Sequence, residues 1–245
     1  MTRFRPGFAP TLVVLAVLPL LVFLGFWQLD RGEQKRELLN HYAERQVAAP
    51  VTVEQLLTFD DPAFRRVQLR GHFDGQHSLL LDNRMRDGKV GVELLQPFQD
   101  QASGQWLWLN RGWLPWPSRL KPPEFSTPEQ ILDIQAWVYQ SPGTPFQLHA
   151  DPLNAPWPRL VTAVMPAKLW AELGREGFAD EVRIAPGPAA YLADWPLIST
   201  GMGPEKHTAY AVQWFAMALA LLGLYLYLGW HTAQEKRHGN GHQSA

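Results

Sequence analysis

A single histidine at the edge of a long apolar segment is the residue of this chain best placed to bind a metal ion or a metal-containing cofactor. His207 is the first residue of the segment HTAYAVQWFAMALALLGLYLYLGW, which covers residues 207–230. A neutral imidazole is a common metal ligand. In a helix, small and aromatic side chains would follow the histidine on the same face: Tyr210, Ala211, Trp214 and Ala218. They could line one wall of a porphyrin slot, or they could be ordinary helix packing below a polar interfacial residue.

Two other patterns suggest chemistry less strongly. His72 and His77 flank an expected hairpin turn and could reach one metal ion, although no third ligand is evident. Ser118 and Lys121 match the S-x-x-K pattern, but they lie in a proline-rich loop without a K-T-G companion motif. The chain also lacks a phosphate-binding glycine loop, H-E-x-x-H and G-x-S-x-G. We therefore expect a protein that is not an enzyme, with an anchored enzyme as the lesser alternative.

Polar residues within apolar segments are candidates for a structural or partner-binding role. Arg111, Gly112 and Trp113 lie in an expected strand that holds several tryptophans. Arg111 could serve a partner, or it could be a structural arginine that pairs with a carboxylate. Gln213 lies inside the apolar segment 207–230, where we expect it to hydrogen-bond to the first apolar segment of the chain, through Gln28.

Two segments are long and apolar enough to cross a membrane as helices. Residues 10–29 and 207–230 contain no Asp, Glu, Lys or Arg, and about 20 such residues span a hydrocarbon core. Pro19 lies in the first segment, where a membrane helix tolerates it. A cleaved signal peptide is the alternative for this segment, but the sequence around Gly25 does not supply a small-x-small cleavage site. We expect two transmembrane helices.

Basic residues outside these segments predict the orientation. Arg3 and Arg5 precede the first segment, and Lys236 and Arg237 follow the second, which favours both termini in the cytoplasm. Basic residues after the first segment weaken this prediction of the orientation, but long domains cross the membrane largely regardless of their charge. The expected regions are a cytoplasmic N-terminus at 1–9, transmembrane helices at 10–29 and 207–230, a periplasmic domain at 30–206 and a disordered cytoplasmic tail at 231–245.

Composition excludes several classes of function. The chain of 245 residues has no cysteine, which excludes disulfide bonds, thiol redox chemistry, thiolate metal binding and a cysteine nucleophile. A formal net charge of −1 argues against a nucleic-acid partner. The body between the apolar segments, about 175 residues long, is large enough for one domain with its own core.

The sequence of this body predicts a mainly antiparallel, β-rich domain. From Phe64 onward, apolar and polar residues alternate as in a strand with one solvated face. Turn sequences such as Asp74-Gly75 and Asp87-Gly88 separate the alternating segments. We expect strands at 65–74, 78–82, 90–98, 106–113 and 131–139, weaker strands at 182–185 and 191–198, and helices at 31–46, 53–57 and 166–173.

Six blocks of the chain, in the same order, resemble motifs of the surfeit locus protein one family. The signature G-x-W-Q-L-x-R-x-x-x-K is similar to Gly25–Arg31 with Lys35. Internal motifs of the family are similar to Arg66–Gly71 with Phe73, Leu81–Arg84 and Gly91–Pro97. The block V-N-R-G-W-x-P resembles Leu109–Trp113 with Pro115, and H-x-x-Y-A-x-x-W-F resembles His207–Phe215. Before the histidine this chain has Glu205-Lys206, where the family often has asparagines.

The resemblance implies a function in the assembly of haem-copper terminal oxidases, in which haem a is delivered to or inserted into subunit I of cytochrome c oxidase. It implies that His207 is a ligand of the haem iron, with Tyr210, Trp214 and Trp27 shaping the slot. Other residues of the matching blocks or of the spans would have a structural role or would bind partner proteins: Gln28, Arg31, Arg111, Gly112, Trp113 and Gln213.

The implied partners are oxidase subunit I, other oxidase assembly factors and the lipid bilayer. The implied location is the inner membrane of a bacterium, because the short head before the first span has no Arg- and Ser-rich transit sequence. The alternative function from another class is a scaffold without haem, which would stabilise subunit I during assembly.

Overall fold

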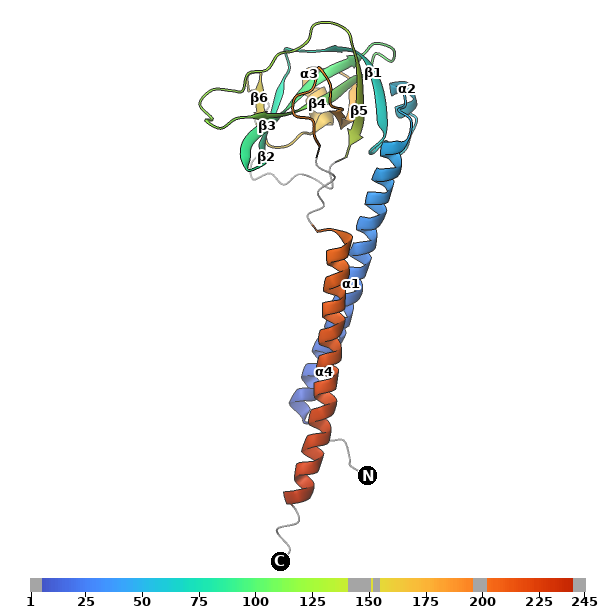
Figure 1. Ribbon diagram of the computed structural model, residues 1–245, viewed down its shortest axis with the longest axis vertical. Coiled ribbons are helices and arrows are strands. Elements are labelled where there is room, and N and C mark those ends of the chain that lie inside the picture. Colours follow the sequence, from blue (N-terminus) through green and yellow to red (C-terminus); the bar gives the residue numbers. More distant parts are fainter. Residues whose placement is uncertain (1–5, 141–150, 152–154, 196–201, 240–245) are drawn as a thin grey trace, which may run out of the picture. The chain divides into compact units, whose positions relative to one another are not determined.

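The computed structural model describes residues 6–140, 151, 155–195 and 202–239, and Figure 1 labels their helices and strands. The chain divides into two compact units. Residues 1–40 and 198–245 form the first unit, which is helical, and residues 41–197 form the second, which holds all the strands.

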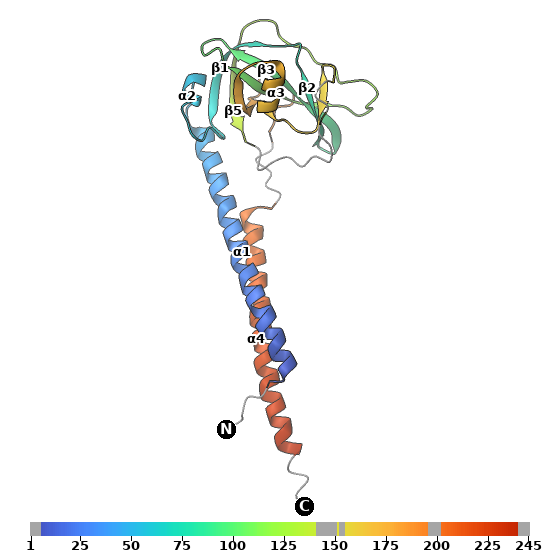
Figure 2. The same ribbon diagram turned by 180° about the vertical axis from the view of Figure 1, so that it is seen from behind.

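Two long helices lie side by side in the first unit (Figures 1 and 2). Helix α1 covers Phe8–Val47 and helix α4 covers Pro204–Gly239, and each contains a segment long and apolar enough to cross a membrane. The expected continuation of the first helix to residue 46 is confirmed. The expected disorder from residue 231 onward is wrong for residues 231–239, which continue α4. Pro204 begins α4 because proline is tolerated in the first helical turn.

Five strands of the second unit close into a small barrel. They are β1 (Arg66–Phe73), β3 (Lys89–Asp100), β4 (Trp106–Pro115), β5 (Leu132–Tyr139) and β7 (Gly177–Ile184). The pairs β1–β3, β3–β4, β4–β7, β7–β5 and β5–β1 complete the circle, and only β4–β7 is parallel. This order is that of a five-stranded Greek-key barrel of the OB type.

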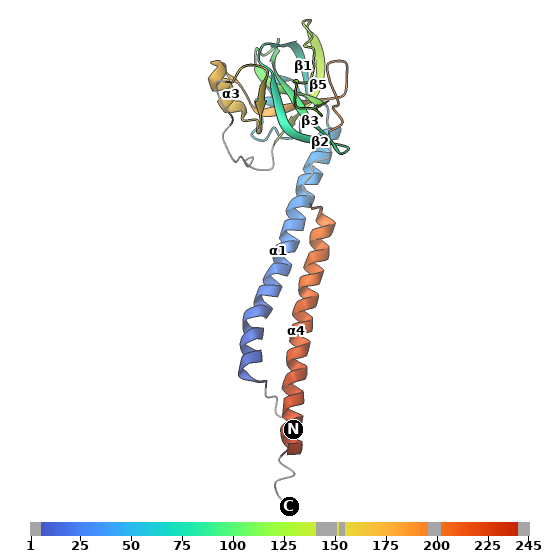
Figure 3. The same cartoon turned by 90° about the vertical axis from the view of Figure 1, so that its left-hand side faces the viewer.

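The remaining elements extend or cover the barrel. Strand β2 (Leu79–Arg86) pairs with β3, and β6 (Arg159–Val161) adds to β2 in parallel. Helix α3 (Pro166–Leu173) lies beside the strands (Figure 3) and packs Leu169 and Trp170 on this extension, and α2 (Val53–Leu56) packs on the barrel core.

The β-rich, mainly antiparallel domain between two apolar helices is confirmed, with differences at weak elements. Strand β7 begins at Gly177 instead of residue 182, and the three-residue strand β6 had no sequence signal. Of the strand expected at 191–198, the described part makes a single bridge, between Leu192 and Trp113, and residues 196–198 lie outside the described residues.

Strand β4 is buried on both faces, and this explains its unusual sequence. Leu107 and Leu109 point into the barrel core, while Trp108 on the other face stacks on Trp170 of α3 with ring centroids 5.0 Å apart. A strand between two apolar layers has no solvated face, so apolar residues run continuously instead of alternating with polar ones.

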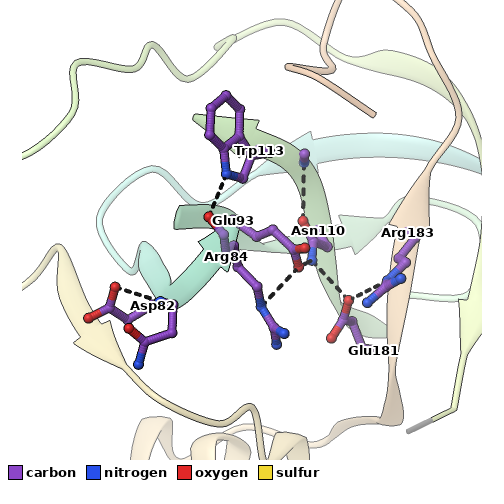
Figure 4. A network of polar contacts seen from close by, with 9 residues as sticks. Asp82, Arg84, Glu93, Asn110, Trp113, Glu181 and Arg183 are labelled. Atoms are coloured by element: carbon purple, nitrogen blue, oxygen red, sulfur yellow. Dashed lines mark hydrogen bonds and ion pairs between the residues drawn. The ribbon is translucent and has the colours of Figure 1, made fainter. Parts of the chain in front are cut away.

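A buried polar network joins three neighbouring strands at Asn110 (Figure 4). The side-chain amide of Asn110 on β4 donates to Glu93 of β3 at 2.8 Å and to Glu181 of β7 at 2.9 Å. Arg183 donates to the same oxygen of Glu181 at 2.9 Å. Burial by itself would lower the pKa of Arg183, but the charges of Glu181 and Glu93 outweigh it and hold that pKa above its ordinary value. The network therefore stabilises one register of β3, β4 and β7.

Replacing Asn110 with leucine should lower the free energy of unfolding by about 2–4 kcal/mol, because both buried carboxylates lose a hydrogen bond. Chemical denaturation of the purified protein measures this change. Arg70→Ala is the control, since Arg70 and Asp133 form an ion pair whose side chains are 65% and 63% exposed. Its loss should change the free energy by less than about 1 kcal/mol. Equal effects of the two substitutions would contradict a stabilising role of the network.

Candidate functional site

Helices α1 and α4 approach each other closely because small residues line their contact. A Cβ added at Gly25 would lie 2.6 Å from the ring of Phe215. Seven residues later, a Cβ added at Gly32 would lie 3.3 Å from the Cβ of His207. The small residues of α4 at this contact are also buried: Ala211 and Ala218. Small residues with this spacing let two helix backbones pack tightly, as they do inside membranes.

His207 lies in this contact and is held by α1. Its side chain is buried, and Nδ1 is 2.7 Å from Oε1 of Gln28. An amide oxygen only accepts hydrogen bonds, so Nδ1 carries the hydrogen and Nε2 of the neutral ring keeps the lone pair. Metal-binding histidines are commonly held in this way, with the second ring nitrogen donating to a fixed acceptor. The geometry therefore orients His207 for coordination through Nε2.

The structure brings together only part of the aromatic set expected around His207. Trp214 lies two turns further along the same face of α4 and is half-buried, and Tyr210 lies beside that face with 44% exposure. Trp27 follows Gly25 by two residues, which places it about 200° around α1 and away from the contact with α4. Its ring lies 5.8 Å from the guanidinium carbon of Arg31. Trp27 therefore lies outside the contact that holds His207.

Gln28 has a different partner from the one expected. It accepts a hydrogen bond from His207, while Gln213 is exposed on α4. Gln213 follows His207 by six residues, about 240° around the helix, so it cannot face α1 together with His207. Arg31 donates to Gln34 of its own helix at 3.0 Å.

The contact between the helices has no room for a porphyrin, so a haem held by His207 would have to lie on an outward surface of the helix pair. Phe215 covers Gly25, and Ala211 is fully buried, so the contact itself is filled. One imidazole nitrogen beside flat aromatic side chains is a suitable set for a haem with an axial histidine. Tyr210 and Trp214 supply the aromatic surface on α4.

In the barrel, Arg111 holds three segments together instead of pairing with a carboxylate. Its Nε donates to the carbonyl of Ala189 at 2.8 Å, and Nη1 donates to Oε1 of Gln96 at 2.6 Å and to the carbonyl of Ser126 at 2.8 Å. The residue is only 2% exposed, and this burial holds the pKa of Arg111 below its ordinary value. The expected carboxylate partner is therefore wrong, and the contacts of Arg111 are structural.

Gly112 and Trp113 continue this structural cluster. The backbone N–H of Gly112 donates to Oδ1 of Asn110 at 3.1 Å, and Nε1 of Trp113 donates to the carbonyl of Arg84 at 2.9 Å. Gly112 has a φ of 111°, a conformation that favours glycine. Both residues are buried and stabilise the end of β4.

The two turn histidines are engaged in other contacts. Nδ1 of His77 lies 2.8 Å from Asp74, whose carboxylate also pairs with Arg175 at 2.7 Å. Burial by itself would raise the pKa of Asp74, but the hydrogen bonds from Arg175 and His77 outweigh burial and hold that pKa below its ordinary value. His72 packs edge-on against Trp106. Within the described residues, no group of three His, Cys, Asp or Glu side chains could hold a metal ion.

Sequence reasoning missed two features of the site. The pairing of Gln28 with His207 joins residues far apart in the chain, and no local pattern shows it. The packing role of Gly32 does have a signal, because Gly25 and Gly32 are seven residues apart and so lie on one face of a helix.

The described residues define a class of protein with two long apolar helices, which hold one histidine at their contact, and with one small β-barrel. The chain belongs to the SURF1 family, whose model matches residues 15–219 and so covers the barrel and most of the helix pair.

Curated relatives agree with this assignment. A SURF1-like protein of Rickettsia felis is 26% identical over 222 residues, which cover 88% of this chain and 94% of the relative. The cytochrome oxidase assembly protein SHY1 of Saccharomyces cerevisiae is 28% identical over 105 residues, which cover 41% of this chain and 27% of SHY1. A SURF1-like protein of Dictyostelium discoideum is 31% identical over 124 residues, 46% of this chain and 44% of the relative. The match thus covers nearly all of the Rickettsia protein and less than half of the other two.

Replacing Gly25 with leucine should separate the two helices, because even a Cβ there overlaps the ring of Phe215. The hydroxyls of Thr11 and Tyr225 are 3.0 Å apart at the far end of the contact. Since the chain has no cysteine, Thr11→Cys with Tyr225→Cys gives a unique pair for a short thiol cross-linker. We expect efficient cross-linking that Gly25→Leu largely abolishes. Gly223→Leu is the matched control, because no atom lies within 4 Å of a Cβ at that position, and similar yields in both variants would contradict the close contact.

Proposed function

We propose that this chain is an assembly factor for a haem-copper terminal oxidase, and that it assists the delivery of haem a to subunit I or its insertion there. Two observations support the proposal. The chain belongs to the SURF1 family, and its yeast relative is named as a cytochrome oxidase assembly protein. The observation that carries the haem part is the bond between His207 and Gln28 across two apolar helices.

We place α1 and α4 in a bilayer as two spans. Their length and apolar composition support this placement, and the basic residues before the first span and after the second favour both termini in the cytoplasm. The barrel then lies on the periplasmic side of a bacterial inner membrane. The Rickettsia felis relative, which aligns over almost its whole length, supports a bacterial origin.

The residues of the helix pair would act by orienting one nitrogen of the His207 ring, Nε2. Haem a, when bound, would supply an iron that an imidazole nitrogen can coordinate. Gln28 holds Nδ1 of His207, so Nε2 would be the nitrogen that coordinates, and Gly32 lets the backbone of α1 approach the Cβ of His207. Trp214 and Tyr210 offer flat apolar surface beside it. A hydrophobic macrocycle held at the end of a span could pass to another membrane protein without crossing water. No step of this function requires catalysis.

Full-length protein purified from cells that make haem a should show a haem absorption spectrum, which His207→Ala abolishes because the axial ligand is lost. Gln28→Ala should weaken haem binding about 10–100-fold, the usual effect of losing the residue that orients a metal ligand. Titration of the purified variants with haem, followed by absorption, measures both effects.

Gln213→Ala is the matched control, since it removes the same amide from an exposed position on α4. It should leave the spectrum and the affinity unchanged. A spectrum that survives His207→Ala would contradict the assignment of the ligand, and haem affinity unchanged in Gln28→Ala would contradict the orienting role.

A scaffold without haem, which stabilises subunit I during assembly, is the second candidate. The internally bonded barrel favours it, because Arg111 and the Asn110 network leave a rigid body suited to docking. Colourless wild-type protein that still co-purifies with subunit I would support this function instead. Changes at Arg111 or Trp113 would then weaken the association through loss of the folded barrel.

A further inference from the structure

One strand of the barrel continues past the end of its neighbour. Strand β5 begins at Leu132, but it pairs with β7 only from Ala136 onward. The last contact is the N–H of Ala185, which donates to the carbonyl of Gln135 at 2.8 Å. The chain after it reads Pro186-Gly187-Pro188, and neither proline has an N–H with which to extend the ladder.

The backbone of Asp133 therefore faces an open edge. The backbone N–H and C=O of one strand residue point to the same edge of the strand, and those of every second residue point to that same edge. Because the carbonyl of Gln135 points toward β7, both backbone groups of Asp133 point to that side as well. Among residues 185–189, which the structure describes, the N–H of Ala185 is the only backbone donor bonded to β5. The other edge of β5 is already paired with β1.

A groove of about 280 Å³ lies along this edge. Residues 132–135 form one wall, and residues 184–189 form the other. Leu132, Ile134, Ile184 and the two prolines make the walls largely apolar, while Asp133 and Gln135 bring polar side chains to the rim. A water molecule occupies about 30 Å³, so the groove has room for one or two side chains of a ligand.

We propose that this edge binds an extended peptide segment of a partner protein, which pairs with the backbone of Asp133 and places an apolar side chain in the groove. Among the described residues, no group bonds to the N–H or the C=O of Asp133. Such a donor and acceptor match the backbone of another strand, and an apolar pocket beside them selects alternate side chains. A lipid tail would fill the pocket but leave both backbone groups without partners. This proposal goes beyond the proposed function and does not involve His207.

The test uses a phage-displayed library of short random peptides and the full-length protein. We expect selection of peptides with alternating apolar residues, which bind wild-type protein in a fluorescence anisotropy titration. Asp133→Pro should weaken their binding at least about tenfold, because it removes the N–H that faces the groove. Proline is tolerated at an edge where the N–H does not serve the existing ladder. Asp133→Ala is the matched control, since it keeps the N–H and should bind as wild type does.

A second variant covers the case in which Asp133→Pro does not fold. A Cβ added at Gly187 would have only one atom within 4 Å, the carbonyl oxygen of Ala185 at 3.9 Å, so Gly187→Phe can enter the groove without a clash at its base. It should also abolish peptide binding. No selected peptide, or equal binding to wild type and Gly187→Phe, would overturn the proposal. The haem spectrum should be unchanged in Gly187→Phe, so failure of this site and failure of the haem function give different results.

Discussion

The close approach of α1 and α4 is the constraint on which the proposed haem site depends. A buried imidazole nitrogen without a partner would cost about 1–3 kcal/mol, so His207 can lie in the contact only because Gln28 accepts its hydrogen. Gln28 reaches His207 because Gly32, one turn further along α1, has no side chain to keep the helices apart. Packing and chemistry are therefore linked, since the small residues that allow the contact also orient the ligand.

In the barrel, too, most buried polar groups lie next to side chains or carbonyls that satisfy their hydrogen bonds. Strands β3, β4 and β7 bury two carboxylates that the amide of Asn110 joins, with Arg183 donating to one of them, and a buried arginine, Arg111, that is satisfied by neutral oxygens. Trp108 is one exception, because its buried Nε1, like Nε of Arg84 and Nη2 of Arg86, has no hydrogen-bond partner among the described residues. Its stacking on Trp170 compensates in part. A body with so many internal bonds presents its free backbone groups at few places, and the end of β5 is one of them.

Local patterns predicted most elements but few partners. Alternation located β1 and β5 to within a few residues, turn sequences and apolar runs located β3 and β4, and longer apolar runs located both long helices. The predictions that failed concern contacts between distant residues: Gln213 with Gln28, and a carboxylate for Arg111. Each of these depends on how one element is rotated against another, or on which distant oxygen fills a buried site. Sequence spacing within one element carries no information on either.

By itself, the sequence determined the apolar segments and most of the strand pattern, because burial and periodicity act on residues near each other in the chain, and its motifs indicated the family. The tertiary structure alone decided that β1 pairs with β3, at Gly71, where a Cβ would lie 1.8 Å from the carbonyl oxygen of Gln99. It also decided that Nδ1 of His207 pairs with Gln28, and that Asp133 of β5 has no partner on the side of β7 within the described part of the chain. These features arise from groups brought together by packing, and only the folded chain brings them within hydrogen-bonding distance.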